Sequence, residues 1–201
     1  MGTFKRLGPV LGLMMLAGCA SAVKSQRLRA DYATVDRQQV KRLAVVTQPF
    51  PPGKQYVGDL WSLIARQWLN QNRDFLVKEN TSLPERPTDL AFKDQCVEGI
   101  EGVLWLDPQV KQVGEGAEVA LKAQLIRCRD GEEVWAAESA GSWDSKDEKY
   151  NERAEQYVKE LGPDVAPYVV PSYKLLVATL DTLPNPELNE ADKDEKIELG
   201  E

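Results

Sequence analysis

The apolar and polar residues after position 101 alternate in a way that predicts a three-stranded antiparallel meander. The segments that carry the pattern are 102–106, continuing through Val113, then 118–127, and then 133–139, continuing toward Trp143. Alternation is typical of strands that bury one face and expose the other. Gly114-Glu115-Gly116 and Asp130-Gly131 mark the two reversals, and the aspartate–glycine pair is a strong hairpin signal.

The amino-terminal half predicts a strand–helix–strand unit. Residues 42–47 have a continuously apolar centre at 43–46, as in a strand buried on both faces. Residues 57–72 carry apolar side chains at three- and four-residue spacings, which predicts a helix, and 75–77 follow as a short strand. Trp61 and Trp68 lie on the apolar face of that helix, and we interpret them as core residues rather than as a ligand-binding pair.

Three further helices complete the expected fold. They are predicted at 90–97, at 147–161 and in the apolar stretch that follows Pro171 and ends near Pro184. The order β-α-β-α-β-β-β-α-α indicates the α/β (α+β) class, a mixed sheet with helices packed on it. We expect this domain to span residues 41–183.

A basic start followed by a short apolar run predicts a signal segment over residues 1–18. Lys5 and Arg6 precede the apolar run at 7–16. A membrane-spanning helix needs about 20 apolar residues, so this run is too short to be one. We therefore leave it out of the fold.

The stretch Leu16-Ala17-Gly18-Cys19 resembles the bacterial lipobox. The resemblance implies that Cys19 is acylated and becomes the first residue of the mature protein. It also implies that Ala20 permits sorting to the outer membrane of a Gram-negative envelope. The alternative is an ordinary cleaved signal peptide with an incidental cysteine.

The segments on either side of the domain differ in charge. Residues 19–40 lack apolar periodicity and carry several basic side chains, which predicts a lipidated tether, either solvated or lying against acidic headgroups. A flexible tether of about 20 residues has a root-mean-square reach of roughly 25 Å. Residues 184–201 are acidic and are predicted to be disordered, or to order on contact with a partner.

The net charge of the chain argues against nucleic acid as a partner. The formal net charge is −7, and removing residues 1–18 with Lys5 and Arg6 makes it −9. A strongly acidic protein repels polyphosphate backbones and anionic surfaces.

Two of the three cysteines remain once Cys19 is assigned to lipid. Cys96 and Cys128 are predicted to form a structural disulfide in an exported protein, which would add about 3.7 kcal/mol by the loop-entropy estimate. The alternative is a pair of buried free thiols. A redox site is not expected, because no C-x-x-C pair is present.

The absence of histidine from the chain removes most nucleophilic and zinc chemistry. No phosphate-binding or dinucleotide-binding glycine motif occurs either, so we expect no cofactor and no metal. Catalysis by carboxylates alone would use Glu101 and Asp107, which flank Trp105. Solvated carboxylates are the ordinary interpretation, and we do not expect an enzyme.

The meander resembles a known group of domains. The strand that ends in Asp107, the glycine turn, the alternating strand and the segment 130–135 are similar to the amino-terminal domain of the TolB translocation protein. Related arrangements occur in the curli-secretion lipoprotein and in lipoprotein activators of penicillin-binding proteins. The resemblance implies a binding or assembly fold and assigns no functional residue.

A second resemblance covers nearly the whole chain and implies membership of a Gram-negative envelope lipoprotein family. The segments that carry it are the lipobox and residues 41–46, 167–171, 183–188 and 194–197. It supports an envelope location and implies no particular activity.

These patterns together predict a lipid-anchored, periplasm-facing accessory protein of the envelope without catalysis. Its expected partners are the membrane, through the anchor, and an envelope protein or peptidoglycan. The alternatives are a carboxylate-dependent cell-wall enzyme and an oligomeric secretion-channel component. The sequence leaves the oligomeric state open.

Overall fold

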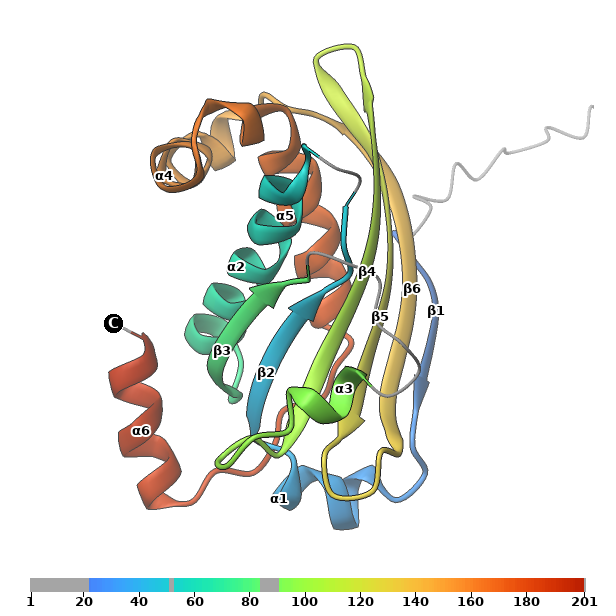
Figure 1. The fold of residues 1–201 in the computed structure, drawn as a ribbon, viewed down its shortest axis with the longest axis vertical. Coiled ribbons are helices and arrows are strands. Elements are labelled where there is room, and N and C mark those ends of the chain that lie inside the picture. The colour runs from blue at the N-terminus through green and yellow to red at the C-terminus, as the bar shows by residue number, and fades with distance from the viewer. Residues whose placement is uncertain (1–21, 51–52, 84–90, 201) are drawn as a thin grey trace, which may run out of the picture.

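A computed structural model describes residues 22–50, 53–83 and 91–200 (Figure 1). The predicted signal segment, Cys19 and Ala20 lie outside the described residues. The strands are β1 (Val23–Leu28), β2 (Arg42–Thr47), β3 (Leu76–Ser82), β4 (Gly102–Val113), β5 (Gly116–Arg127) and β6 (Glu133–Asp144). The helices are α1 (Arg37–Gln39), α2 (Gln55–Asn72), α3 (Ala91–Asp94), α4 (Asn151–Leu161), α5 (Ala166–Leu180) and α6 (Glu190–Gly200).

The strands form one mixed sheet in the order β1-β6-β5-β4-β2-β3. β4, β5 and β6 are the predicted antiparallel meander, and β2 runs parallel to both β3 and β4. Gly114 and Gly131 have φ angles of 59° and 78° at the two predicted turns, a region that glycine adopts without steric cost. The predicted fold class is confirmed.

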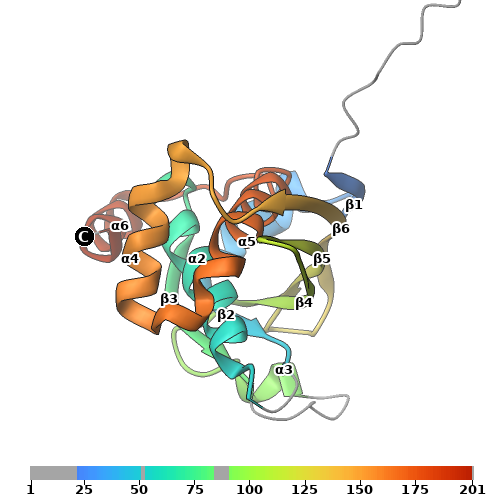
Figure 2. The same ribbon diagram turned by 90° about the horizontal axis from the view of Figure 1, so that it is seen from above.

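Helices cover one face of this sheet. α5 packs on β5 and β6, and α2 packs on β2 and β3. Figure 2 shows α2, α4, α5 and α6 together on one side of the sheet. The core between the layers includes Trp61 of α2 and Leu176 of α5, both fully buried, and Leu125 of β5.

Several element boundaries differ from the prediction. The strand predicted at 75–77 continues to Ser82, and the helix predicted at 90–97 is the short α3. The prediction that the last apolar helix begins after Pro171 is wrong, because α5 begins at Ala166 and contains Pro171. Proline removes only one backbone donor there, and the buried side chains around it hold the helix against the sheet.

The predicted tether is wrong for residues 23–40, which belong to the domain. β1 pairs antiparallel with β6, from Val23 opposite Ser139 to Leu28 opposite Trp135. Most side chains of β1 are exposed, so backbone hydrogen bonds rather than apolar burial hold it. A polar edge strand of this kind leaves no hydrophobic pattern for sequence reasoning to find.

Residues that follow β1 are buried as well. The Tyr32 hydroxyl donates a hydrogen bond to the Pro184 carbonyl at 2.6 Å. Asp36 is fully buried and pairs with Arg127, whose guanidinium also binds the Asp130 carboxylate at 2.6 and 2.9 Å. The Tyr32 contact ties the segment after β1 to the chain after α5, and the Asp36 contact ties it to the turn between β5 and β6.

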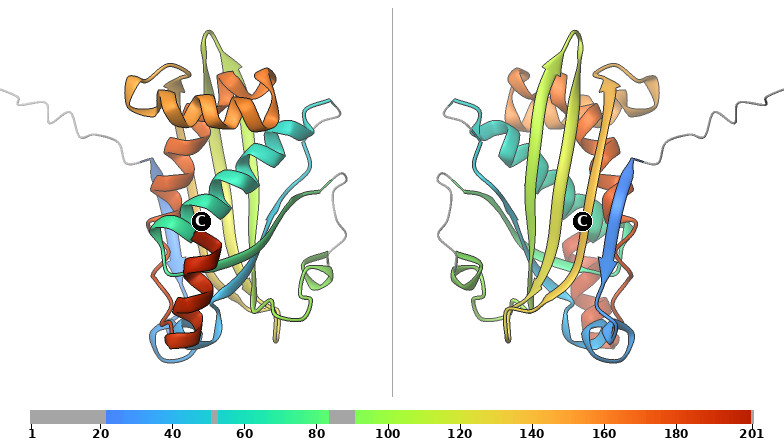
Figure 3. Two further views of the ribbon diagram at one scale, coloured as in Figure 1. Left: turned by 90° about the vertical axis from the view of Figure 1, so that its left-hand side faces the viewer. Right: turned by 90° about the vertical axis from the view of Figure 1, so that its right-hand side faces the viewer.

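The predicted disordered tail is also wrong, because residues 190–200 form α6 beside α2 and β3 (Figure 3). Asp192 binds Lys41 at 2.5 Å and Arg42 at 2.6 Å. Glu195 binds Arg42 at 2.6 Å and also binds Lys78. We call these five side chains the α6 clasp.

The basic side chains of the clasp stabilise the charged forms of its two carboxylates. Burial raises the pKa of Asp192, but hydrogen bonds from Lys41, the Asn189 backbone and Arg42 outweigh it and lower that pKa to about 2. The hydrogen bond from Lys78 lowers the pKa of Glu195 in the same way. The acidic tail docks because its basic partners lie around residue 41 and at Lys78 of β3. Composition alone does not connect these distant segments.

Candidate functional site

The face of β1, β6, β5 and β4 that points away from α5 is the candidate site, and we call it the open face. Along β5 the odd-numbered residues Val119, Leu121 and Leu125 are buried. The even-numbered residues Glu118, Lys122 and Gln124 are exposed. Alternation along one strand thus produces a packing face and a solvent face.

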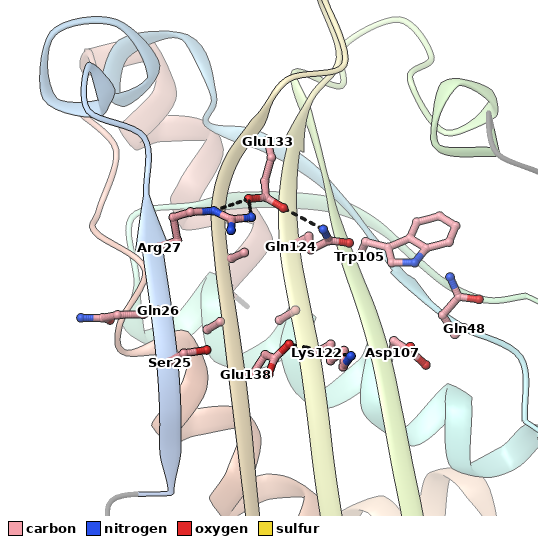
Figure 4. A pocket seen from close by; sticks show the side chains of 13 residues that line it. Ser25, Gln26, Arg27, Gln48, Trp105, Asp107, Lys122, Gln124, Glu133 and Glu138 are labelled. Atoms are coloured by element: carbon pink, nitrogen blue, oxygen red, sulfur yellow. Dashed lines mark hydrogen bonds and ion pairs between the residues drawn. The ribbon is translucent and has the colours of Figure 1, made fainter.

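The open face carries a hollow with a volume of about 710 Å³ (Figure 4). Its side chains form two rows across the four strands, set by the strand register. The first row is Trp105, Gln124, Ala136 and Arg27, and the second is Asp107, Lys122, Glu138 and Ser25. Gln48 and Glu133 complete the polar lining.

The first row is held by a hydrogen-bonded chain. Glu133 accepts hydrogen bonds from Arg27 Nε at 3.0 Å and from Gln124 Nε2 at 2.7 Å. The hydrogen bond to Glu133 raises the pKa of the Arg27 guanidinium. One carboxylate therefore links a guanidinium on β1 to an amide on β5, and that amide lies opposite Trp105 in the strand register.

The second row is looser. Lys122 Nζ lies 3.8 Å from Glu138 Oε1, and both side chains are more than half exposed. Asp107 stands opposite Lys122 in the register, and within the described residues its carboxylate makes no hydrogen bond or ion pair. Exposed pairs of this kind contribute less than about 1 kcal/mol to stability. Little is lost when such a pair separates, so these side chains are available to contact another molecule.

Trp105 lies at the side of the hollow nearest the end of β2. It is only partly buried, and Figure 4 shows its indole beside Gln48. The Gln48 backbone N–H donates to the Leu106 carbonyl at 2.8 Å, which keeps the residue alongside β4. Gln48 Oε1 is buried and accepts no hydrogen bond from the described residues.

The structure does not bring Glu101 and Asp107 together. Six residues of extended chain separate them, about 20 Å, whereas a glycosidase pair lies about 5–9.5 Å apart. The Glu101 carboxylate accepts hydrogen bonds from the Lys41 and Arg42 backbone N–H groups at 2.7 and 2.9 Å. Glu101 is thus a structural residue, while Asp107 belongs to the hollow.

The two cysteines predicted to pair are joined. Cys96 and Cys128 form a disulfide with their Cα atoms 5.5 Å apart, which links the segment after α3 to the end of β5. The core interpretation of the tryptophan pair holds for Trp61, which is fully buried. Trp68 packs edge-on against Tyr173, with ring centroids 6.0 Å apart.

Sequence reasoning missed most of the hollow. The alternation in β5 contained the signal for Lys122 and Gln124, because polar residues facing away from a core mark a solvent face. Arg27 was hidden in the predicted tether, and the register that aligns it with Trp105 follows from strand pairing alone.

A metal-ligand cluster and a membrane-spanning helix are both absent from the described ranges. Among residues 22–50, 53–83 and 91–200, no three His, Cys, Asp or Glu side chains cluster as metal ligands. Over the same ranges, no helix has the length and apolar character to cross a bilayer.

No protein-family model and no curated protein matches this chain. Among solved structures, it is similar to the PelC dodecamer from Paraburkholderia phytofirmans, with 15% identity over 77% of this chain and 94% of that chain and a TM-score of 0.43. It is also similar to the hypothetical protein CT253 from Chlamydia trachomatis, with 11% identity over 71% and 95% and a TM-score of 0.47. Lipoprotein GNA1162 from Neisseria meningitidis matches with 14% identity over 60% and 96% and a TM-score of 0.36. All three TM-scores are below 0.5, so these likenesses do not bear on the function of this chain.

Proposed function

We propose that this protein is a lipid-anchored accessory protein on the periplasmic face of the outer membrane. It carries out no catalysis and binds an envelope protein or a cell-wall polymer through the open face. The observation that carries the proposal is the contrast between the two sides of one sheet. α2 and α5 bury one side, while the other presents a hollow with a half-buried indole and polar side chains.

The lipobox-like sequence supports the anchor. The position of β1 determines how far the domain can lie from the bilayer. Ala22, whose carbonyl accepts from the Ala140 N–H at 2.9 Å, already belongs to the sheet. Only three peptide units separate it from Cys19, a reach of at most about 11 Å. An acylated Cys19 would therefore hold the domain close to the bilayer, rather than on a flexible tether of roughly 25 Å.

Fractionation of the full chain tests the anchor. The variant Cys19→Ser is expected to move from the membrane fraction to the soluble periplasmic fraction, because it cannot be acylated. The unaltered chain is expected to accumulate as a precursor when signal peptidase II is inhibited. Membrane retention of Cys19→Ser, or normal processing under inhibition, would contradict lipid anchoring.

Site-specific photocrosslinking in living cells tests the open face. A photoreactive amino acid replaces Gln124 in the hollow in one strain and Glu152 on the exposed side of α4 in a control strain. We expect a discrete adduct from position 124 that disappears when Trp105→Ala is added, and none from position 152. Adducts from position 152 alone, or an adduct at 124 that Trp105→Ala leaves unchanged, would refute the proposed binding surface.

A further inference from the structure

The side chains of the hollow combine one flat apolar surface with a dense set of hydrogen-bonding groups. The partly buried Trp105 indole supplies the apolar surface, and a tryptophan combines a large apolar ring with one N–H donor. Asp107 follows two residues later on the same face of β4, at a spacing of about 7 Å. Gln124 stands directly opposite Trp105 on β5. One ligand ring lying on the indole is therefore within reach of both a carboxylate and an amide.

The charges of the hollow argue against a highly charged ligand. Two basic and three acidic side chains line it, giving a net charge of −1. Arg27 is already bound to Glu133, and Lys122 stands between two carboxylates in its row. A polyanion would meet three carboxylates and Lys122 as the weakly paired cation of the lining, and a polycation would meet Lys122 and Arg27.

The polar groups that remain available favour hydroxyl groups as partners. The Asp107 carboxylate is an acceptor without a donor among the described residues. It is only partly buried, so a hydroxyl group of a ligand can reach it and donate a hydrogen bond. Asp107 lies on the same face of β4 as Trp105, which offers the apolar surface.

We infer that the hollow binds a neutral glycan, with a sugar ring against the Trp105 indole and ring hydroxyls donating to the Asp107 carboxylate. This inference rests on the proposed function, which makes the open face the binding surface, and specifies the chemistry of the ligand. A pyranose offers what the hollow lacks: hydroxyl donors around a face of apolar C–H groups, without net charge. The long open surface of β4 and β5 suits a chain of such rings rather than a single sugar.

Isothermal titration of the full chain in mild detergent tests this inference. The probes are the neutral tetramers of β-1,4-linked N-acetylglucosamine and of β-1,4-linked glucose, with a heparin-derived tetrasaccharide as the anionic comparison. We expect at least one neutral tetramer to bind and the anionic one not to bind. We expect Trp105→Ala to weaken that binding at least tenfold and Trp105→Phe to retain most of it.

A second variant keeps the test informative if Trp105→Ala unfolds. Gln124 is exposed, so Gln124→Lys leaves the fold intact while placing a long cation in the hollow, and it is expected to weaken binding at least tenfold. The matched control is Gln38→Lys, at an exposed position in α1 that lies outside the residues lining the hollow.

The contrary outcomes are distinct. Absence of binding by either neutral tetramer up to about 10 mM, or binding of the anionic tetramer alone, would overturn the glycan inference. Binding that Trp105→Ala and Gln124→Lys leave unchanged would overturn this site. If the tetramers fail to bind while crosslinking from position 124 still yields a Trp105-dependent adduct, the glycan inference fails and the proposed function stands. Absence of that adduct overturns the proposed function itself.

Discussion

The two faces of the same strands differ in what they are built to do. On the side of α5, β5 and β6 present Leu125, Trp135 and Ser139, all buried, and the Ser139 and Thr179 hydroxyls lie 2.6 Å apart in a hydrogen bond. On the open face the same strands present Lys122, Gln124 and other polar side chains, which hydrogen-bond or pair with one another at the surface and remain in contact with solvent. The comparison teaches that the packing that stabilises the fold lies on one face, whereas the proposed binding surface lies on the other. Substitutions on the two faces should therefore affect stability and binding separately.

The largest expected effect contrasts two tryptophans. Trp61→Ala empties a fully buried site under the sheet, and we expect a loss of about 3–5 kcal/mol in the free energy of unfolding. Trp105→Ala on the open face is expected to cost at least about 1 kcal/mol less than that, because its side chain is only partly buried. Urea unfolding of both variants measures the difference. Equal losses of unfolding free energy would contradict the distinction between a packing face and an open face.

The disulfide is the next largest contribution to stability. Removing it with the double variant Cys96→Ser and Cys128→Ser is expected to cost about 2–4 kcal/mol, since the closed loop no longer restricts the unfolded chain. Crosslinking from position 124 should be unaffected at temperatures where the variant stays folded, because neither cysteine lines the hollow. Loss of the adduct in a folded variant would show that the bridge also shapes the open face.

The α6 clasp gives a third, pH-dependent effect. The folded-state pKa of Asp192 is about 2, below its ordinary 3.8, so its contribution is present above about pH 4 and is lost as the pH falls through 2. Its side chain is 2% exposed, and a shift of this size corresponds to about 2 kcal/mol. Asp192→Asn should therefore lower stability at pH 7 by about that amount and flatten the acid limb of the stability curve. An acid limb identical to that of the unaltered protein would show that the clasp contributes nothing.

The smallest expected effect is on an exposed ion pair. Lys122→Ala removes the partner of Glu138 and should change the free energy of unfolding by less than about 0.5 kcal/mol. The same measurement in high salt should give nearly the same value. A loss of unfolding free energy above about 1 kcal/mol would mean that side chains on the open face also stabilise the fold. That result would contradict the proposed difference between the two faces.

The parts of the fold that the sequence predicts are those encoded in apolar periodicity. The meander and α2 follow directly from alternation and helical spacing, because burial of their side chains drives their formation. Apolar periodicity does not predict β1 or α6, because polar contacts rather than apolar burial attach them to the rest of the domain. α6 does carry one local signal: Asn189 and Asp192 cap each other through side-chain to backbone hydrogen bonds at 2.9 and 3.0 Å.

The candidate site is harder to predict than the fold. Trp105 and Asp107 are visible in the sequence as neighbours on one strand face, although the sequence suggests Glu101 as the partner of Asp107. Strand register instead aligns Asp107 with Lys122 and Trp105 with Gln124 and Arg27. Long-range pairing of this kind is set by the whole sheet, so no local pattern around residue 101 reports it.

The most direct test of the central claim compares binding and stability in the single variant Gln124→Lys. The tagged full chain is crosslinked in living cells and the amount of captured partner is measured, alongside the free energy of unfolding of the purified protein. The account predicts at least a tenfold loss of captured partner with a change in unfolding free energy within about 0.5 kcal/mol. Undiminished capture in a variant of unchanged stability would show that the open face is not the binding surface.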